Sequence, residues 1–364
     1  MRGFPMRVLI TGANGFIGSA LTHRMFQRGD AVRVLLRPGA DTSLLAGLPL
    51  APAAAVNDDA EHVCAFEGEL LRAGSFDAAL RDVDVVVHLA GLRRSPSRQE
   101  LFAVNAEGTR AVCEAMVRCA PNARLVLCSS LTAMGPSRDF PNERAPLKPA
   151  DWYGESKALA EEIALSFADR LHVGIARPSR IVGPGDRENL FFFRLVERGL
   201  RFTIGGAPRP MSTLDVDDLT DGLCRLAERD GPSGEIFCLS RDTTTQEALI
   251  EEIARQMGCR TFRVHLPERL LKVVAAGADA VTRLTGRRLP INRKLAQQLL
   301  APGWTCSIVK ARERLGFDPK IPLAESVARS LDWYRAKAWL KSAASDDSGS
   351  ASTPRPSISS SPSS

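Results

Sequence analysis

Short apolar runs alternate with longer amphipathic segments along the first 180 residues of the chain. The short runs are rich in Val, Ile and Leu, as in DVVVHLAG at residues 84–91, which is typical of strands buried on both faces. The longer segments repeat apolar residues at helical spacing. This pattern predicts strands at 7–11, 31–37, 62–70, 84–91, 124–130 and 172–182, and helices at 15–28, 75–83, 100–119 and 153–170.

Strands that alternate with helices form right-handed β-α-β units, so we expect a parallel sheet with helices on both faces. The predicted fold class is α/β, a doubly wound sheet of Rossmann type in residues 1–180, completed by part of 205–240. Residues 38–61, rich in Ala, Pro and Gly, are predicted to be a loose connection. Gly and Pro then become more frequent and helical segments dominate, which predicts a smaller, mostly helical substrate lobe over 181–341. Residues 342–364 are rich in Ser and Pro, and we expect a disordered tail.

The composition narrows the class of protein further. The chain has 364 residues, 44% hydrophobic and 25% charged, which is ordinary for a globular protein with a real core. Its net charge of +6 comes without a dense run of Lys and Arg, and we expect no nucleic-acid partner. The eight cysteines form no C-x-x-C pair and the five histidines are scattered, so free thiols and no metal site are predicted. Without a signal-peptide pattern or a run of about 18 apolar residues, a cytoplasmic location is expected.

Three glycines lie between the first predicted strand and the first predicted helix. The stretch VLITGANGFIGSAL places Gly12, Gly15 and Gly18 at three-residue spacing. The spacing allows a tight turn in which backbone N–H groups approach a pyrophosphate, and the following helix adds free N–H groups and the positive end of its dipole. Because the motif begins a β-α-β series, it predicts a dinucleotide site.

The end of the second strand bears on the choice between NAD and NADP. A carboxylate about 20 residues after the glycines usually binds the free 2′-hydroxyl of NAD. Here the strand ends in VRVLLRPGAD, with Arg37 near that place and no acidic residue before Asp41. An arginine suits a 2′-phosphate, so we favour NADP over NAD. Arg33 could assist Arg37 or could be a solvated strand residue.

The stretch DWYGESKALAEE at residues 151–162 places Tyr153 and Lys157 one helical turn apart, with Ser156 beside the lysine. A helix start with a lysine on its solvated face is the simplest interpretation. The alternative is chemical, because a cation a few ångströms from a phenol favours the ionised form and prepares the tyrosine for general acid/base catalysis. The rest of the chain has to decide between them.

The motifs occur in an order that resembles the extended short-chain dehydrogenase/reductase family, also called the NAD-dependent epimerase/dehydratase family. The matching pieces are TGANGFIG, HLAG at 88–91, NAEGT at 105–109, SS followed by MG, YGESK, RPSRIVGPGD at 177–186 and STLDVDDLTDGL at 212–223. The resemblance implies a Rossmann fold and hydride transfer to or from a nicotinamide.

The resemblance also implies the catalytic residues. Tyr153 would exchange a proton with the substrate oxygen, while Lys157 would support the phenol and hydrogen-bond the nicotinamide ribose. Ser130 would hydrogen-bond the reacting oxygen, with Ser129 nearer the cofactor and Thr132 as an alternative. The implied cofactor-binding residues are Gly12, Asn14, Gly15, Phe16, Ile17, Gly18, Arg37, Glu69, Leu70, Leu89, Ala90, Gly91, Ser129, Tyr153, Lys157 and Pro178.

Three further residues have less specific expectations. Glu69 stands where the family commonly has an aspartate near the adenine. Asn105 either supports the surroundings of the catalytic tyrosine or is a structural helix residue. His88 is interpreted as a satisfied core residue. The helices near 100–119 and 153–170 resemble those that pair across the family's dimer, which implies a homodimer.

The substrate is less determined than the chemistry. Met211 falls where sugar-nucleotide members of the family usually carry an arginine, and Arg209 is two residues early. The stretches LLRPGAD and RPSRIVGPGD and the closing segment KARERLGFDPKIPLAESVARSLDWYR resemble the 3β-hydroxysteroid dehydrogenase-like and dihydroflavonol reductase-like branch, which acts on hydrophobic alcohols and ketones. The apolar helix predicted at 267–286 could line an apolar pocket, touch a membrane surface or simply pack in the lobe.

Three hypotheses follow. The leading one is an NAD(P)-dependent oxidoreductase of a hydrophobic secondary alcohol or ketone. The alternative is a nucleotide-sugar epimerase or dehydratase, and the third is a non-catalytic dinucleotide-binding protein.

Overall fold

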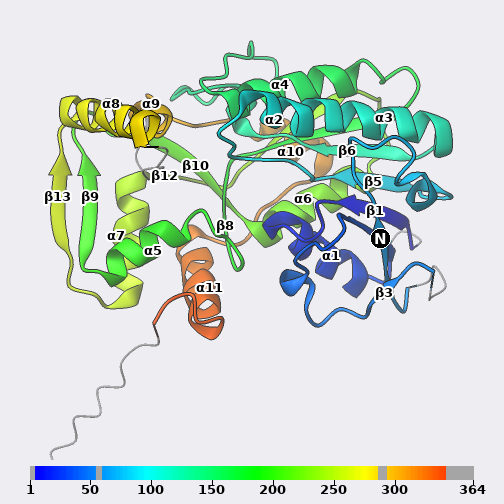
Figure 1. The fold of residues 1–364 in the computed structure, drawn as a ribbon, viewed down its shortest axis with the longest axis horizontal. Helices are drawn as coiled ribbons and strands as arrows, with labels where there is room; N and C mark the ends of the chain where they lie inside the picture. Colours follow the sequence, from blue (N-terminus) through cyan, green and yellow to red (C-terminus); the bar gives the residue numbers. More distant parts are fainter. Residues whose placement is uncertain (1–4, 55–59, 286–292, 342–364) are drawn as a thin grey trace, which may run out of the picture.

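A parallel sheet of eight strands forms the larger part of the molecule (Figure 1). The computed structural model describes residues 5–54, 60–285 and 293–341, so the predicted tail at 342–364 lies outside the described residues. The strand order is β11-β7-β6-β5-β1-β2-β4-β3, and every pairing within this sheet is parallel. The strands are β1 Arg7–Thr11, β2 Ala31–Leu36, β3 Leu50–Pro52, β4 Val63–Glu67, β5 Val85–His88, β6 Arg124–Cys128, β7 His172–Pro178 and β11 Glu235–Leu239.

The order reverses at β1, which lies between β2 and β5. In doubly wound sheets, ligands bind in the crevice outside the carboxyl ends of the strands at such a reversal. The predicted α/β Rossmann fold is therefore confirmed, and its crevice lies where the glycine stretch follows β1.

Helices cover both faces of this sheet (Figure 1). On one face lie α1 Phe16–Gln27 and α6 Val216–Glu228, and on the other α2 Arg98–Phe102, α3 Gly108–Cys119 and α4 Trp152–Leu165. Each face has its own buried cluster, which includes Leu21, Met25, Leu219 and Leu223 on the first side and Val112, Met116, Ile163 and Ala164 on the second. Each large apolar side chain buried in these clusters contributes roughly 1.5–3 kcal/mol.

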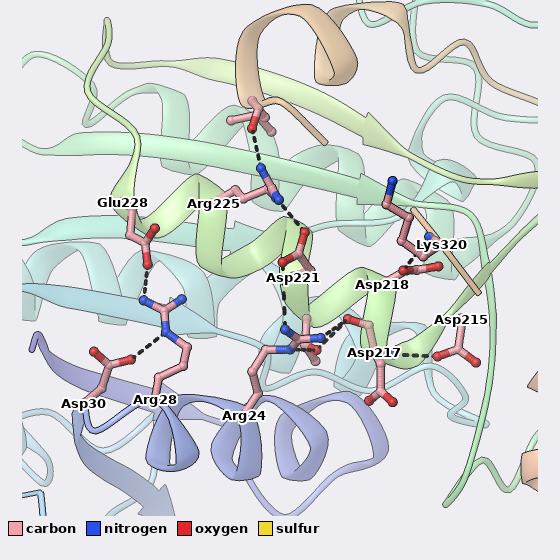
Figure 2. A network of polar contacts seen from close by, with 12 residues as sticks. Arg24, Arg28, Asp30, Asp215, Asp217, Asp218, Asp221, Arg225, Glu228 and Lys320 are labelled. Atoms are coloured by element: carbon pink, nitrogen blue, oxygen red, sulfur yellow. Dashed lines mark hydrogen bonds and ion pairs between the residues drawn. The ribbon is translucent and has the colours of Figure 1, made fainter. Parts of the chain in front are cut away.

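Arg24 on α1 and Arg28 directly after it hold this helix against α6 (Figure 2). Arg24 donates from Nε to Thr220 Oγ1 at 2.7 Å and from Nη2 to the Asp217 carbonyl oxygen at 2.9 Å. One turn later, Arg28 pairs with Glu228. Because the N-terminus of α1 follows the glycine stretch, these contacts fix the direction in which that end of the helix points.

The second lobe is built from two small sheets and several helices, at the left of Figure 1. One sheet has the order β12-β10-β8, and the other pairs β9 with β13. The strands are β8 Arg180–Val182, β9 Leu200–Ile204, β10 Pro210–Asp215, β12 Asp242–Thr245 and β13 Phe262–Leu266. The helices of the chain's second half, apart from α6, are α5 Leu190–Glu197, α7 Gln246–Met257, α8 Glu268–Thr285, α9 Arg293–Leu300, α10 Val309–Leu315 and α11 Leu323–Ala336. Phe193, Leu249 and Tyr334 belong to a buried cluster in this half.

Four segments differ from the predicted elements. Residues 38–61 contain the short helix η1 Ser43–Leu45 and the edge strand β3, which pairs with β4. The helix predicted at 100–119 is α2, a π-helical turn η3 Ala103–Glu107, and α3. The strand predicted at 172–182 is two strands, since β8 leaves the large sheet after Pro178 and pairs with β10. The helix predicted at 75–83 is the shorter 3-10 helix η2 Asp77–Leu80.

The apolar helix predicted at 267–286 is α8, whose last predicted residue lies outside the described part. Leu271 and Ala275 are buried, whereas Val273 is 68% exposed. Within the described residues, no helix combines the length and apolar character needed to cross a membrane.

Candidate active site

The glycine stretch forms a tight turn against the loop that follows β5. Gly12 has a φ of +70°, and a Cβ there would lie 2.6 Å from the backbone nitrogen of Ala90. A Cβ on Gly18 would lie 2.1 Å from the Gly12 carbonyl oxygen. Gly15 precedes α1 without capping it through a side chain, and the first turn of α1 has no acidic residue. This backbone, with N–H groups at a helix N-terminus, fits a pyrophosphate.

A buried histidine connects this turn to α3. The Ala90 N–H donates to Thr11 Oγ1 at 3.2 Å, and Thr11 Oγ1 lies 2.7 Å from His88 Nδ1. On the other side of the ring, Nε2 lies 3.2 Å from Thr109 Oγ1, whose hydroxyl donates to the Asn105 carbonyl oxygen at 2.7 Å. Because the Thr109 proton is already used, Nε2 must donate and Nδ1 must accept.

The chain of donors therefore requires a neutral His88 ring. Burial, reinforced by the charge of Lys157, lowers the pKa of His88 to about 3. The side chain is 1% exposed, so the prediction of a satisfied core residue is confirmed.

Lys157 reaches from α4 into the crevice. Its ammonium donates to the Cys128 carbonyl oxygen at 2.8 Å, and its side chain is buried at 6% exposure. A Cβ on Gly91 would lie 3.6 Å from Nζ. Since Gly91 follows the residue that touches Gly12, the ammonium lies beside the glycine turn. Tyr153, half-buried, lies one turn earlier on the same face of α4.

The start of α4 is fixed on the turn that carries Ser130. Asp151 caps the helix by accepting from the Gly154 N–H at 2.7 Å, and Gln298 of α9 donates to its other oxygen. A Cβ on Gly154 would lie 2.4 Å from the Thr132 carbonyl oxygen, so the helix and the short 3-10 helix η4 Leu131–Ala133 are in contact. Tyr153 and Ser130 therefore lie on neighbouring segments.

The hydrogen bonds of this turn distinguish Ser130 from Thr132. Ser130 Oγ accepts from the Thr132 N–H at 3.2 Å and from the Thr132 hydroxyl at 2.9 Å. The Ser130 proton is left to donate to a ligand, whereas the Thr132 proton is used. Of the two, Ser130 is the better donor to a substrate oxygen.

Ser129 points in another direction. Its hydroxyl donates to Glu161, and Glu161 forms an ion pair with Arg177 in which the two side chains are 1% and 3% exposed. Arg177 donates from Nε and Nη2 to both carboxylate oxygens, at 2.6–3.1 Å. The Ser129 side chain thus joins a buried ionic network behind Ser130.

Asn105 connects the loop after β5 with α4. Its side chain accepts from the Leu92 N–H at 2.7 Å and donates to the Leu92 carbonyl oxygen at 2.8 Å and to Ser156 Oγ at 2.9 Å. Ser156 in turn donates to the Tyr153 carbonyl oxygen at 2.8 Å. Of the two roles left open for Asn105, these contacts favour support of the surroundings of Tyr153.

The carboxyl ends of β2 and β4 lie on the far side of the glycine turn. Pro38, Glu69 and Arg72 line a hollow of about 490 Å³ there. Glu69 is exposed, and its main-chain N–H donates to Ser75 Oγ at 3.0 Å. Arg37 is also exposed, and within the described part of the chain its guanidinium has no hydrogen bond or ion pair.

Arg33 corrects one expectation. It is neither at the cofactor crevice nor solvated, because it is 6% exposed and donates to the Ala79 carbonyl oxygen at 2.9 Å. Strand β2 is buried on both faces, so its one charged side chain is satisfied by main-chain oxygens.

The other predicted cofactor-binding residues are placed as follows. Phe16 and Ile17 begin α1, and Asn14 donates to the Asp41 carbonyl oxygen at 3.0 Å. The Cδ1 of Leu70 would lie 3.2 Å from a Cβ on Gly108. The Leu89 N–H donates to the Thr11 carbonyl oxygen at 3.2 Å, and Pro178 ends β7.

Sequence reasoning missed Arg93. Its guanidinium carbon lies 5.7 Å from the centre of the Tyr153 ring. The available signal was its position two residues after Gly91, in the loop that follows the HLAG stretch.

Comparison with known proteins identifies the family. A model of the NAD dependent epimerase/dehydratase family matches residues 8–240. The chain belongs to this family. It is similar to the ceramide reductase of Caulobacter vibrioides, with 30% identity over 335 residues that cover 92% of this chain and 96% of that protein. It is also similar to the sterol-4-alpha-carboxylate 3-dehydrogenase ERG26 of Saccharomyces cerevisiae, with 25% identity over 348 residues, 90% of this chain and 97% of that one.

Solved structures share the fold. The dTDP-glucose 4,6-dehydratase DesIV of Streptomyces venezuelae, solved with NAD bound, superimposes with a TM-score of 0.72 at 23% identity, covering 92% of this chain and 99% of that one. The protein is thus an oxidoreductase of the extended short-chain dehydrogenase/reductase type that uses a nicotinamide cofactor. The hypothesis of a non-catalytic binding protein is set aside.

Proposed function

We propose that the protein transfers hydride between NAD(P) and a hydrophobic secondary alcohol or ketone, with Tyr153 as general acid/base. In the direction of oxidation, the alcohol O–H gives its proton to the Tyr153 oxygen while the hydride on the same carbon leaves. In reduction, Tyr153 returns that proton to the carbonyl oxygen, and Ser130 donates a hydrogen bond to it. A bound nicotinamide would accept the hydride in the oxidation and donate it in the reduction.

The position of Lys157 carries this proposal. A lysine on a solvated helix face would be exposed, whereas this ammonium is buried between the Cys128 carbonyl oxygen and Gly91. It lies one turn from Tyr153 and beside the turn that fits a pyrophosphate. An ammonium in that place can hydrogen-bond a ribose hydroxyl and lies on the helix that carries the phenol.

The activities of two relatives support an apolar substrate, since one is a ceramide reductase and another a sterol dehydrogenase. Met211, at the place expected for a nucleotide-sugar arginine, is buried at 7% exposure. The alternative is a nucleotide-sugar epimerase or dehydratase, and its support is the similarity to the dTDP-glucose 4,6-dehydratase of Streptomyces antibioticus, with 27% identity over 362 residues.

Turnover of the cofactor separates the two functions. A reductase consumes added NADPH or NADH with a ketone, while an epimerase or dehydratase shows no net change. We expect net consumption with ketones of apolar molecules and none with nucleotide sugars. The reverse result would establish the alternative.

The chain offers a matched pair of variants, because its two tyrosines are Tyr153 and Tyr334. Tyr153→Phe is expected to lower turnover by about 10²–10⁴-fold, the usual size of a general acid/base contribution, with cofactor affinity nearly unchanged. Tyr334 is buried in the second lobe and donates to the Asp186 carbonyl oxygen, so Tyr334→Phe should retain turnover. Equal turnover in Tyr153→Phe and wild type would remove Tyr153 from the chemistry.

For the cofactor we propose NADP, supported by Arg37, which follows β2, is exposed and has no ion pair among the described residues. The ratio of kcat/KM for NADPH over NADH should exceed one and should fall in Arg37→Ala with the NADH value unchanged. A preference for NADH that Arg37→Ala leaves unaltered would assign the protein to NAD.

We also propose a homodimer in the cytoplasm. The outer side of α2 and α4 carries a hollow of about 630 Å³ lined in part by Phe102, Leu147, Leu159 and Leu165, which is suited to pairing with a second copy. All eight cysteines are free, and six of them are buried, as expected for a reducing compartment. Sedimentation equilibrium tests the dimer, and a mass of one chain would exclude it.

A further inference from the structure

Two arginines converge on one carboxylate next to Tyr153. Arg93, which lies 5.7 Å from the Tyr153 ring, places its Nε 3.3 Å from Glu188 Oε2. Arg94 pairs with the same oxygen. Both arginine side chains are more than half exposed. Because Arg94 can hold Glu188 alone, Arg93 is able to turn to another anion without leaving Glu188 unpaired.

A third arginine, Arg180, lies close to this pair, is partly buried and has neutral hydrogen-bond partners. Its Nε and Nη2 donate to Asn189 Oδ1 at 2.9 and 2.6 Å, and its Nη1 donates to Gln246 Oε1 at 3.1 Å. Among the described residues, no carboxylate lies within ion-pair distance of its guanidinium. Burial, with repulsion from Arg93, lowers the pKa of Arg180 to about 10.

The nearby carboxylates do not balance these cations. Asn189 lies between Arg180 and Asp186. It accepts from Arg180, and its main-chain N–H and side-chain amide both donate to the Asp186 carboxylate. Glu188 is shared by the two exposed arginines. Arg93, Arg94 and Arg180 thus face Asp186 and Glu188, which leaves one positive charge in excess beside the catalytic tyrosine.

A buried polar group next to Arg180 also lacks a partner. Among the described residues, the amide nitrogen of Gln246, whose oxygen accepts from Arg180, has no hydrogen-bond partner. Thr213 is paired with Arg180 across β8 and β10, and its buried hydroxyl also finds no partner in the part of the chain that the structure describes. Unsatisfied buried donors cost about 1–3 kcal/mol each, so a ligand that accepts from them is stabilised.

We propose that Arg93 and Arg180 form an anion site beside Tyr153, which binds a carboxylate carried by the apolar substrate near its reacting carbon. The proposal rests on the proposed function and narrows its substrate class to apolar alcohols or ketones that bear an acid group. A single excess charge matches a carboxylate better than a doubly charged phosphate. The planar guanidinium also suits bidentate binding of a carboxylate, which orients the molecule relative to Tyr153.

Binding of matched amphiphiles tests the site without any turnover. The cofactor-loaded protein is titrated calorimetrically with decanoate, decyl phosphate and decan-1-ol, which share one apolar chain. We expect decanoate to bind wild type at least about 10-fold more tightly than decan-1-ol, which corresponds to about 1.4 kcal/mol. Equal affinities for the acid and the alcohol would overturn the anion site, and tighter binding of decyl phosphate than of decanoate would overturn the carboxylate assignment.

Variants locate the effect. Arg93→Gln should abolish the preference for decanoate, and because this side chain is half exposed the variant should fold normally. Arg180→Gln should do the same if it folds. The control is Arg187→Gln, since Arg187 is exposed and pairs with Asp41 instead, and it should keep the full preference. A preference that survives Arg93→Gln, or disappears in Arg187→Gln, contradicts the proposal.

The result is separable from the proposed function. Ketone turnover that depends on Tyr153, without a preference for decanoate, would remove the anion site and leave the oxidoreductase chemistry intact. A preference for decanoate together with full turnover in Tyr153→Phe would leave the anion site and remove the assigned base.

Discussion

The buried ion pair between Glu161 and Arg177 offers the sharpest test of how the active site is held. Glu161 lies on α4 one turn after Lys157, and Arg177 lies on β7. The carboxylate also accepts from Ser129, the neighbour of Ser130. Glu161→Gln keeps the size of the side chain and removes its charge, so it leaves the Arg177 cation buried without a carboxylate in contact.

The expected cost follows from burial. Burial by itself lowers the pKa of Arg177, but the hydrogen bonds and charge of Glu161 outweigh it and raise the pKa above the usual value. Removing one partner of such a pair costs about 3–5 kcal/mol, because the other charge stays desolvated. Against a typical total stability of 5–15 kcal/mol, this is a large loss. Replacing both residues by leucine should recover most of it.

Urea unfolding measures this change as a shift of the transition midpoint at constant slope. The control is Glu228→Gln, which breaks the partly exposed Arg28–Glu228 pair and should cost no more than about 1 kcal/mol. The reasoning fails if Glu161→Gln costs as little as Glu228→Gln. It also fails if the double leucine variant is less stable than Glu161→Gln, since the residual buried charge would then not be the cause.

Further predictions concern other parts of the same framework. The pKa of His88 is lower in the folded than in the unfolded chain, so below about pH 6.5 the unfolded chain takes up a proton that the folded chain does not. The free energy of unfolding should therefore fall by up to about 1.4 kcal/mol per pH unit toward pH 3. Unfolding measured across this pH range should show a flatter slope in His88→Gln. Of the eight thiols, Cys119 and Cys259 are only partly buried and should react first with Ellman's reagent, so rapid reaction of more than two would contradict the buried placement of the others. Gly12→Ala should abolish cofactor binding in calorimetry because its Cβ would collide with the Ala90 nitrogen, whereas Gly29→Ala, which also has positive φ but open space around it, should cost about 1 kcal/mol of stability and keep affinity.

Local patterns in the sequence predicted most of the fold. Alternating apolar runs predicted the strands of the large sheet, because a strand buried on both faces needs a continuous apolar stretch. The exceptions are segments whose structure depends on distant partners. Strand β3 exists because Leu50–Pro52 meets β4, and β8 separates from β7 because Arg180 pairs with Thr213, far along the chain. In neither case does the sequence of the segment itself predict the pairing.

The same division holds at the active site. The glycine turn and the Tyr153–Lys157 pair could be predicted from the sequence. Glycines three residues apart are typical of a dinucleotide-binding turn, and residues four apart lie on the same face of a helix. Arg33 shows the limit, because one arginine between apolar residues fits a solvated position as well as a buried one. Its satisfaction by the Ala79 carbonyl oxygen, 46 residues away, becomes visible only in three dimensions.

The charges near Tyr153 show why substrate specificity is harder to predict than chemistry. Proton transfer needs groups that one helix and one strand end can supply, so they stand close together in the sequence. The balance of charge around the substrate is a sum over segments that meet only on folding. Arg93 follows β5, Arg180 begins β8 and Gln246 begins α7. In the sequence, each arginine alone resembles a surface charge. The excess positive charge becomes visible only when the arginines are counted against the nearby carboxylates of Asp186 and Glu188.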